Sequence, residues 1–575
     1  MADITAPEYI SPYVVTTAGG LVLDRDVYTM PVGAATILQN FEPSVKGGYR
    51  RLSGTSKYSS TQVGGASSVI LGVAVFNDSV VVAQSTSVYK GTGSAWTSID
   101  SGRTSAGRYR FETYNFTTNE ERLIFADGAN YASLYNGTTV TDIKGNATNV
   151  TTTGSTTGAS TSLTVGAAAG IVAGMYVTGT NVAGGSTVSS ISGTTVILST
   201  ASSGSVSGSV VFDGLGTAPI DPSMIAAFKN HMFFSGMSAN PNSLQFSALG
   251  DENDFTASNG AGILNVDSTI VALKSFRDSL IIFCEDRIYK LTGNALADFA
   301  IAPVSRNVGC SDAFSVQEIG GDVIFLAPDG LRTIAGTARI GDVELGTVSK
   351  QIQDRIGDIG FEKISSVIIR SKSQYRLFYP KDGGSVSAAK GIIGVLKANP
   401  SGQVGWEYSD IRGLKPACCV SGFISGVEQI VHGGYDGYVY LQETGNSFDG
   451  TAMRAIYRSP DLTMGDAGIR KIMQRINVNY DPEGSVDVSL FVKYDFEDAA
   501  TPQPTAYNLT TADTAAIYGS SLYGSAVYDA EGMPIVRQSV EGSGFTVVVR
   551  LEDTSINAPI TLKGFELEFT PGARM

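Results

Sequence analysis

The chain has 575 residues, of which 67 are glycine and only 16 % are charged, so long solvated helices are excluded in favour of short strands joined by tight turns. Acidic residues outnumber basic ones by 54 to 40, which gives a net charge of −14. This balance argues against a surface that grips the phosphates of nucleic acids. The length suits about three to five domains, or one repeat array with additions.

Residues 1–59 are predicted to form an extended N-terminal arm. The opening Met1–Glu8 carries acidic residues where an export signal carries basic ones, so no such signal is expected. Only residues 34–40 are expected to form a short helical turn. Because the arm is too short for a core of its own, we expect it to pack on the C-terminal domain or on a neighbouring subunit.

A hairpin pattern recurs after the arm. The segments Phe76–Gly93 and Phe276–Gly293 align without a gap, and each reads as an apolar strand, a polar turn and a second strand that ends in Tyr-Lys-x-Thr-Gly. Weaker copies begin at Glu121, Asn230, Gly321, Gln374 and Glu428. Seven copies of a unit this size predict an all-β fold, a β-propeller of about seven blades, in which stacked sheets protect one another's edges.

The spacing of these copies predicts an insertion. The separations from Asp78 to Glu121 and from Asp278 to Gly321 are both 43 residues, whereas Glu121 and Asn230 are 109 residues apart. Removing the 66 residues 147–212, which contain no charged side chain, restores a separation of 43. Apolar residues alternate with polar ones in this stretch, so we expect a small folded β domain rather than a membrane span.

The propeller is therefore predicted in two parts, residues 60–146 and 213–455. The last segment, 456–575, changes character again, because long runs such as Ile560–Phe569 alternate strictly between apolar and polar residues. Strict alternation is typical of half-buried strands, and we expect a C-terminal β domain that resembles a sandwich.

Few residues in the chain could carry chemistry. The two histidines, His231 and His432, each lie within a strand-like segment and are expected to be structural. The densest acidic cluster, Asp251–Asp254, is expected to be a solvated loop rather than the carboxylate pair of a glycosidase. The sequence thus indicates no catalytic residue, no cofactor-binding residue, no metal ligand and no cofactor.

The four cysteines, none of which forms a C-x-x-C pair, are expected to be reduced core residues, and both tryptophans are expected to pack within blades. These residues are Cys284, Cys310, Cys418, Cys419, Trp96 and Trp406.

Both ends of the chain carry distinctive motifs. In the N-terminal run 20–55 these are above all Asp24-Arg-Asp, Met30-Pro-Val-Gly-Ala-Ala and Gly48-Tyr-Arg-Arg-Leu-Ser-Gly-Thr55. At the C-terminal end they are Tyr457-Arg-Ser-Pro-Asp-Leu462, Lys471-Ile-Met-Gln-Arg and the run from Ala558 to Gly572. With these motifs, which cover about a fifth of its length, the chain resembles the tail nozzle (tail tubular, or hub) proteins of short-tailed bacteriophages.

The resemblance implies a structural viral protein of the virion tail, assembled in the cytoplasm of the host bacterium, and not an enzyme. Its expected partners are other copies of itself in a hexameric ring, a portal-adaptor protein above the ring, and a tail fibre or tailspike at the side or below. Double-stranded DNA is expected to pass through during ejection without specific binding. An acid-rich channel wall would suit this passage, because it repels the duplex.

Two other functions stay open at this stage. One is a propeller enzyme that degrades glycans, such as a tail depolymerase, and the other is an adhesin that binds the host surface. Neither the host, the fibre partner nor the role of the insertion 147–212 follows from the sequence.

Overall fold

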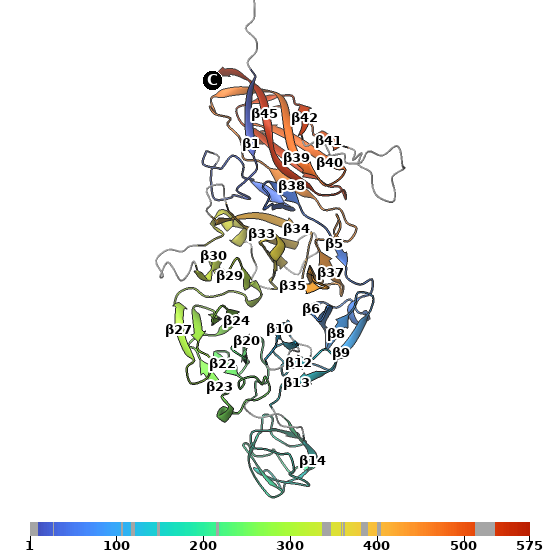
Figure 1. Cartoon of the computed structure of the whole chain (residues 1–575), viewed down its shortest axis with the longest axis vertical. Coiled ribbons are helices and arrows are strands. Elements are labelled where there is room, and N and C mark those ends of the chain that lie inside the picture. Colours follow the sequence, from blue (N-terminus) through green and yellow to red (C-terminus); the bar gives the residue numbers. More distant parts are fainter. Residues whose placement is uncertain are drawn as a thin grey trace, which may run out of the picture. The chain divides into compact units, whose positions relative to one another are not determined.

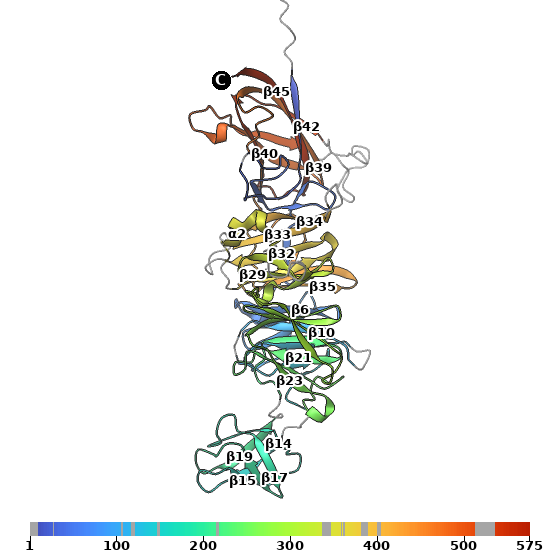
Figure 2. The same ribbon diagram turned by 90° about the vertical axis from the view of Figure 1, so that its left-hand side faces the viewer.

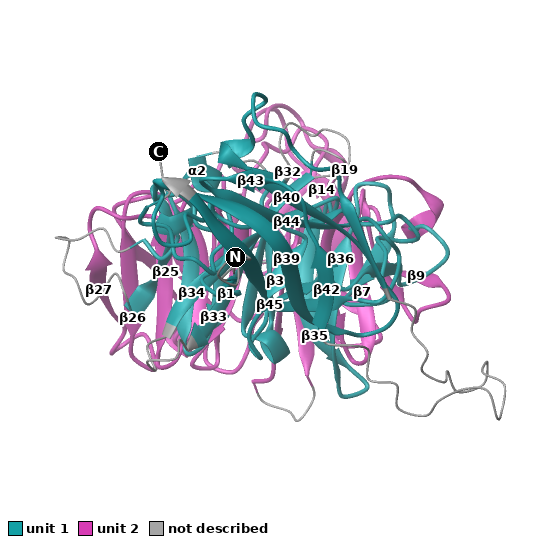
Figure 3. Cartoon of the chain, turned by 90° about the horizontal axis from the view of Figure 1, so that it is seen from above, with its two compact units in different colours: residues 1–62, 317–336, 345–575 teal, residues 63–316, 337–344 magenta. Residues whose placement is uncertain are grey.

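The computed structural model describes residues 10–574 except 27, 105–106, 117–120, 146–149, 214–217, 336–346, 358, 360–362, 381–388, 399–403 and 512–534. The expected absence of an export signal at Met1–Glu8 lies outside the described residues. The chain forms two compact units (Figure 3). The first comprises residues 1–62, 317–336 and 345–575, and the second comprises residues 63–316 and 337–344.

The second unit holds four small antiparallel sheets, each of four strands in chain order (Figure 1). They are β6 (Ile70–Phe76), β7 (Ser79–Gln84), β8 (Ser87–Gly91) and β9 (Trp96–Asp100); β10 (Arg110–Tyr114), β11 (Arg122–Ala126), β12 (Ser133–Tyr135) and β13 (Val140–Asp142); β20 (Met224–Phe228), β21 (His231–Ser235), β22 (Ser243–Phe246) and β23 (Gly262–Asn265); and β24 (Ile270–Phe276), β25 (Ser279–Cys284), β26 (Ile288–Thr292) and β27 (Ala300–Ser305). The first strands β6, β10, β20 and β24 lie next to one another in that order, which is how blades pack.

The first unit holds three further groups of strands that resemble these blades: a three-stranded sheet, the first four strands of a nine-stranded sheet, and a four-stranded sheet. They are β28 (Gln317–Ile319), β29 (Asp322–Ala327) and β30 (Gly330–Thr333); β31 (Ser365–Ile369), β32 (Gln374–Pro380), β33 (Ala389–Ala398) and β34 (Val404–Arg412); and β35 (Cys418–Ile424), β36 (Val427–Gly433), β37 (Val439–Gln442) and β5 (Thr55–Lys57). Here too the first strands β28, β31 and β35 are neighbours. The seven sheets are the blades of a β-propeller, and helix is confined to short pieces such as α2 (Gln353–Gly357) in the described part of the chain.

The hairpin repeat predicted from the sequence is confirmed in register. Val82 on β7 pairs with Tyr89 on β8, and Ile282 on β25 pairs with Tyr289 on β26. Each of the seven predicted copies supplies the second strand of one blade. Each of these strands lies between two neighbours in its sheet. Ile282 belongs to a core shared by the third and fourth blades.

The insertion is confirmed as a separate folded module (Figure 2). Its strands are β14 (Val150–Ser155), β15 (Ser162–Val165), β16 (Tyr176–Gly179), β17 (Val188–Ser192), β18 (Thr195–Leu198) and β19 (Ser207–Asp213). They form one six-stranded sheet in the order β16-β19-β14-β15-β18-β17, and a bridge between Tyr176 and Thr187 joins its two edge regions. The module encloses its own apolar core, centred on residues such as Leu163 and Phe212.

The N-terminal arm is a set of short strands that pair with the rest of the first unit: β1 (Ser11–Thr16), β2 (Ile37–Gln39), β3 (Phe41–Pro43), β4 (Tyr49–Arg51) and β5. The expectation that it packs on the C-terminal domain is confirmed, because β1 and β4 pair with the last strand of the chain. The helical turn expected at 34–40 is wrong. Ile37–Gln39 is a strand instead, because pairing with a segment more than 400 residues away outweighs the local preference.

The C-terminal segment is a two-layered β domain (Figure 2). Its strands are β38 (Ala455–Arg458), β39 (Ile469–Pro482), β40 (Val486–Tyr494), β41 (Tyr507–Thr511), β42 (Ile535–Ser539), β43 (Ser543–Gly544), β44 (Val547–Asp553) and β45 (Ile560–Arg574). One sheet runs β3-β4-β45-β39-β42, with β1 and β43 attached, and the other contains β38-β44-β40-β41. Alternate residues of both sheets, such as Leu567 and Leu490, share one core, so the sandwich-like domain is confirmed. No described helix is both long and apolar enough to cross a membrane.

Deletion of the insertion tests its independence. Val150 pairs with Phe212, so the two ends of the module lie about 5 Å apart and a short Gly/Ser joint can replace residues 147–212. We expect the shortened chain to melt cooperatively with unchanged β-sheet content by circular dichroism, because the module has its own core. The isolated module should also fold. Loss of the cooperative transition in the shortened chain would show that the blades depend on the insertion.

A charge placed in the blade core tests the assignment of the repeat. Ile282 is fully buried, and Ile282→Asp should lower the free energy of unfolding by about 3 kcal/mol or more, because it buries an unpaired carboxylate. Lys290→Asp places the same carboxylate on the exposed part of the adjacent strand and should change stability by less than about 0.5 kcal/mol. Equal melting of the two variants would mean that the blade assignment is wrong.

Candidate functional site: the junction of the two chain ends

Residues from the two ends of the chain meet where β4 pairs with β45. Tyr49 and Arg50 lie opposite Leu562 and Thr561. Gly48 precedes them with a φ of +81°, and a side chain there would lie 2.3 Å from the carbonyl oxygen of Leu562. Glycine is therefore required at this position both by the left-handed backbone and by the close approach of the last strand.

Tyr49 anchors the arm to the first unit's core. Its ring packs at 5.7 Å from the ring of Tyr457. Its hydroxyl accepts a hydrogen bond from the amide of Gly20 at 3.0 Å and donates one to the carbonyl of Gly33 at 2.9 Å. Burial raises the pKa of Tyr49 well above its usual value, so the hydroxyl is protonated and can donate at physiological pH. One side chain thus contacts two other segments of the arm, at Gly20 and Gly33, and the C-terminal domain at Tyr457.

Arg51 is a second anchor and is fully buried. Its guanidinium donates to the carbonyls of Asn557 at 2.7 Å and Ser555 at 2.6 Å, and to the carbonyl of Asn446 at 3.1 Å. An ion pair of 3.3 Å with Asp553 compensates its charge. Burial lowers the pKa of Arg51, and Asp553 opposes this effect. The planar guanidinium with its several donors suits this role, whereas a lysine ammonium could not serve as many acceptors at once.

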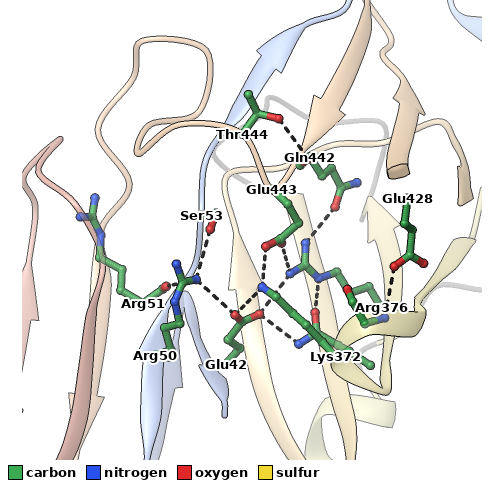
Figure 4. Close-up of polar contacts among 12 residues, drawn as sticks. Glu42, Arg50, Arg51, Ser53, Lys372, Arg376, Glu428, Gln442, Glu443 and Thr444 are labelled. Atoms are coloured by element: carbon green, nitrogen blue, oxygen red, sulfur yellow. Dashed lines mark hydrogen bonds and ion pairs between the residues drawn. The ribbon is translucent and has the colours of Figure 1, made fainter. Parts of the chain in front are cut away.

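An ion-pair network built around Glu42, which we call the Glu42 network, joins the arm to the sixth and seventh blades (Figure 4). Its charged members are Glu42, Arg50, Lys372, Arg376 and Glu443. Glu42 on β3 accepts from Lys372 at 2.6 Å and from Arg376 at 3.2 Å. Arg50 contacts Glu42 at 3.4 Å.

The far side of the Glu42 network is closed by Glu443, which follows β37. Both of its carboxylate oxygens are paired, one with Arg376 and the other with Lys372. Burial alone would raise the pKa of Glu443, but the two cations outweigh it and lower the pKa below its usual range. Arg376 also donates to Gln374 at 2.6 Å and Gln442 at 3.0 Å.

The Glu42 network holds separate segments of the chain together. Both oxygens of Glu42 and of Glu443 accept hydrogen bonds from neighbouring side chains. Arg50 also forms a bidentate ion pair with Glu483 of the C-terminal domain, with hydrogen bonds of 2.6 and 2.8 Å. A pocket of about 290 Å³ beside Arg50 is lined mainly by charged residues of both signs.

The histidines singled out from the sequence are both buried. His231 Nδ1 lies 2.7 Å from the carbonyl of Ser247, and its ring packs edge-on against Phe246 and Phe299. His432 stacks on Tyr440 at 5.1 Å. Burial lowers the pKa of His432 to about 3, so its ring is neutral at physiological pH. The two rings lie in different units.

The solvated loop expected at Asp251–Asp254 is wrong for two of its residues. Glu252 and Asp254 are only 6 % and 8 % exposed. Glu252 accepts from Arg122 at 2.7 Å, and Asp254 accepts from the amide of Thr256 and the side chain of Asn259. The acids are buried because each has specific donors, a compensation that the local sequence does not reveal.

The remaining sequence expectations concern cysteine, tryptophan and metal. Cys284, Cys310 and Cys418 are buried free thiols, as predicted, while Cys419 is only partly buried. Trp406 lies in the sixth blade and stacks on Tyr408 at 6.1 Å. Among the described residues, no group of three or more His, Cys, Asp and Glu side chains could hold a metal ion.

No protein-family model matches the chain, and no curated protein matches it. Solved structures that it resembles include the computationally designed Ika8 protein, with 13 % identity over 67 % of this chain and 99 % of that chain and a TM-score of 0.32. They also include an ancestral GH74 enzyme, with 9 % identity, 77 % and 52 % coverage and a TM-score of 0.31. A quinonprotein alcohol dehydrogenase-like protein from Bacteroides thetaiotaomicron has 8 % identity, 60 % and 65 % coverage and a TM-score of 0.29. At these similarities they carry no information about the activity, ligands or partners of this chain.

Removing the central cation tests the energetic importance of the Glu42 network. Arg376→Met should lower the free energy of unfolding by about 3 kcal/mol, because the buried Glu42 and the partly exposed Glu443 lose the guanidinium that they share and keep only Lys372 in common. Arg454→Met is the matched control, since Arg454 is 57 % exposed and pairs with Glu552; it should cost less than about 1 kcal/mol. Denaturant unfolding of both variants measures this. Equal losses would mean that the network does not stabilise the junction.

The pKa of His432 predicts a dependence of stability on pH. Because this pKa is about 3 in the folded chain and about 6.5 when unfolded, the unfolded state binds an extra proton between these values. Stability is therefore lost as the pH falls below about 6.5, by about 2 kcal/mol between pH 7 and pH 5. His432→Phe keeps a ring against Tyr440 and should lose less stability than wild type over this range. An equal loss of stability in both proteins would show that His432 does not cause this pH dependence.

Proposed function

We propose that the chain is a structural subunit of a bacteriophage tail nozzle. In this role it forms a hexameric ring below the portal-adaptor, conducts double-stranded DNA during ejection and helps to anchor tail fibres or tailspikes. The proposed location is the virion tail, and the proposed partners are other copies of the chain, the portal-adaptor and a fibre or spike.

One observation carries the proposal. The residues on which the resemblance to nozzle proteins rests lie at opposite ends of the sequence, yet they build one junction. Tyr49 packs on Tyr457, and Arg51 bonds to the carbonyls just before Ala558. Chance similarities scattered along a chain of 575 residues have no reason to gather in one folded region. Their meeting supports one shared structural role for both motifs.

The charge of the chain also supports a role as a conduit. Each Lys or Arg that touched a phosphate would add a salt-dependent attraction and slow the passage of DNA. A chain with a net charge of −14 repels the duplex instead, and copies arranged in a ring would add their fields. If the chain is a conduit, its copies should assemble into a ring, and that ring should have no measurable affinity for DNA.

Light scattering during size-exclusion chromatography, together with a DNA titration, tests the proposal. The purified chain should assemble to about six times the 60.1 kDa of one copy, alone or on addition of the portal-adaptor. The assembled ring should not bind a fluorescent DNA duplex measurably at about 150 mM salt. A persistent monomer under both conditions, or tight binding of duplex DNA, would contradict the proposal.

A further inference from the structure

A pocket of about 460 Å³ opens at the seventh blade, apart from the junction residues described above. Its walls come from the loop after β34, from β36 and the turn that follows it, from β37, and from the loop before β38. The charged and aromatic side chains that line it include Lys415, Tyr435, Asp436, Tyr440, Phe448 and Asp449. This volume lies within the range of pockets that bind small molecules.

Two glycines allow the walls of this pocket to come together. A side chain at Gly434 would lie 2.3 Å from the carboxylate of Asp436 and 3.1 Å from the ring of Tyr440. Gly413 has a φ of +89°, and a side chain there would press on the ring of Phe448 at 3.2 Å. Larger residues at these two positions would displace the groups that line the cavity.

The Asp436 carboxylate is fixed in place by its neighbours. One oxygen accepts from the amide of Tyr438 at 3.2 Å, and the other accepts from the hydroxyl of Tyr440 at 2.7 Å. A carboxylate oxygen can accept more than one hydrogen bond, so both retain capacity for a ligand's hydroxyl groups. Tyr440 is in turn held by its stacking on the buried ring of His432. The pocket thus presents a preorganised acceptor beside aromatic surface.

The charges around the pocket are of both signs. Asp436 and Asp449 line it together with Lys415, and Asp449 forms an ion pair of 3.2 Å with Lys57. The Lys415 ammonium lies 4.8 Å from the centre of the Tyr435 ring. An uncharged ligand suits this lining better than an ion, because a buried ion needs an unpaired countercharge. What the pocket offers is aromatic surface for C–H groups and carboxylates for hydroxyl donors.

We propose that this pocket binds one sugar ring of an uncharged saccharide. The carboxylate of Asp436 accepts hydrogen bonds from hydroxyl groups of the ring, and the aromatic side chain of Phe448 covers one of its C–H faces. This inference stands independently of the proposed nozzle function, since a structural subunit and an adhesin could each carry such a site.

Saturation-transfer NMR on the full-length chain tests the proposal. The probes are glucose, galactose, N-acetylglucosamine and rhamnose at millimolar concentration, with tetramethylammonium and acetate as rival ligands. At least one sugar should receive saturation from the wild-type protein, and its affinity should fall at least fivefold in Phe448→Ala and in Asp436→Asn. Asp436→Asn keeps the shape of the side chain, so it tests the site even where Phe448→Ala impairs folding.

Tyr28→Ala is the matched control, because Tyr28 is 80 % exposed and does not line the pocket. It should leave sugar binding unchanged. The proposal is overturned if none of the four sugars binds, if binding survives both pocket variants, or if only tetramethylammonium or acetate shows a transfer that the pocket variants abolish.

Discussion

The pairing of the two ends of the chain is the constraint on which the first unit depends. A propeller blade has edges that must be covered, and the outer strand of the seventh blade, Thr55–Lys57, comes from the N-terminal arm. The same arm supplies β1 and β4 to the sheet that contains the last strand, β45. One segment of about fifty residues therefore completes a blade and a sandwich sheet, and neither is complete until the arm has docked.

The cost of this arrangement is the burial of charge. Glu42, Arg51 and Arg376 are all nearly inaccessible to solvent, and burying an ion is unfavourable unless its partners are in place. Because these partners come from the arm, two blades and the C-terminal domain, the charges are compensated only when all of these parts are docked together. Such a network adds specificity to the docking, since any other packing of the arm would leave a buried charge unpaired.

The sequence predicted the parts of the fold that depend on local pattern. Hairpin strands such as Val80–Val82 and Ile281–Phe283 are apolar runs next to short polar turns, so their pairing can be read from neighbouring residues. The insertion followed from the spacing of these hairpins. The network around Glu42 could not be predicted, because Glu42 and Arg376 are 334 positions apart and neither lies in a distinctive motif. The same limit explains the error at Ile37–Gln39, where distant strand pairing decides the conformation.

The two other errors of prediction have a related cause. Glu252 and Asp254 look solvated in the sequence because acidic residues usually are, but an arginine from another blade and two local donors satisfy them. Likewise, nothing in the sequence around Asp436 indicates a pocket. The walls of this pocket come from separate segments of the chain, at residues 413–415, 432–440 and 448–451. Sites assembled from loops depend on the tertiary fold and become visible only once it is known.

Native-state hydrogen exchange tests most directly whether the two chain ends are held as one cooperative element. The backbone amides of β4, β5 and β45 should exchange with one common opening free energy, as large as that of the sixth-blade strand β32. Arg376→Met should lower this value for β4, β5 and β45 together. If β4 and β5 exchange rapidly while β45 and β32 stay protected, the arm is an accessory to the fold, and the first unit does not depend on the pairing of the two chain ends.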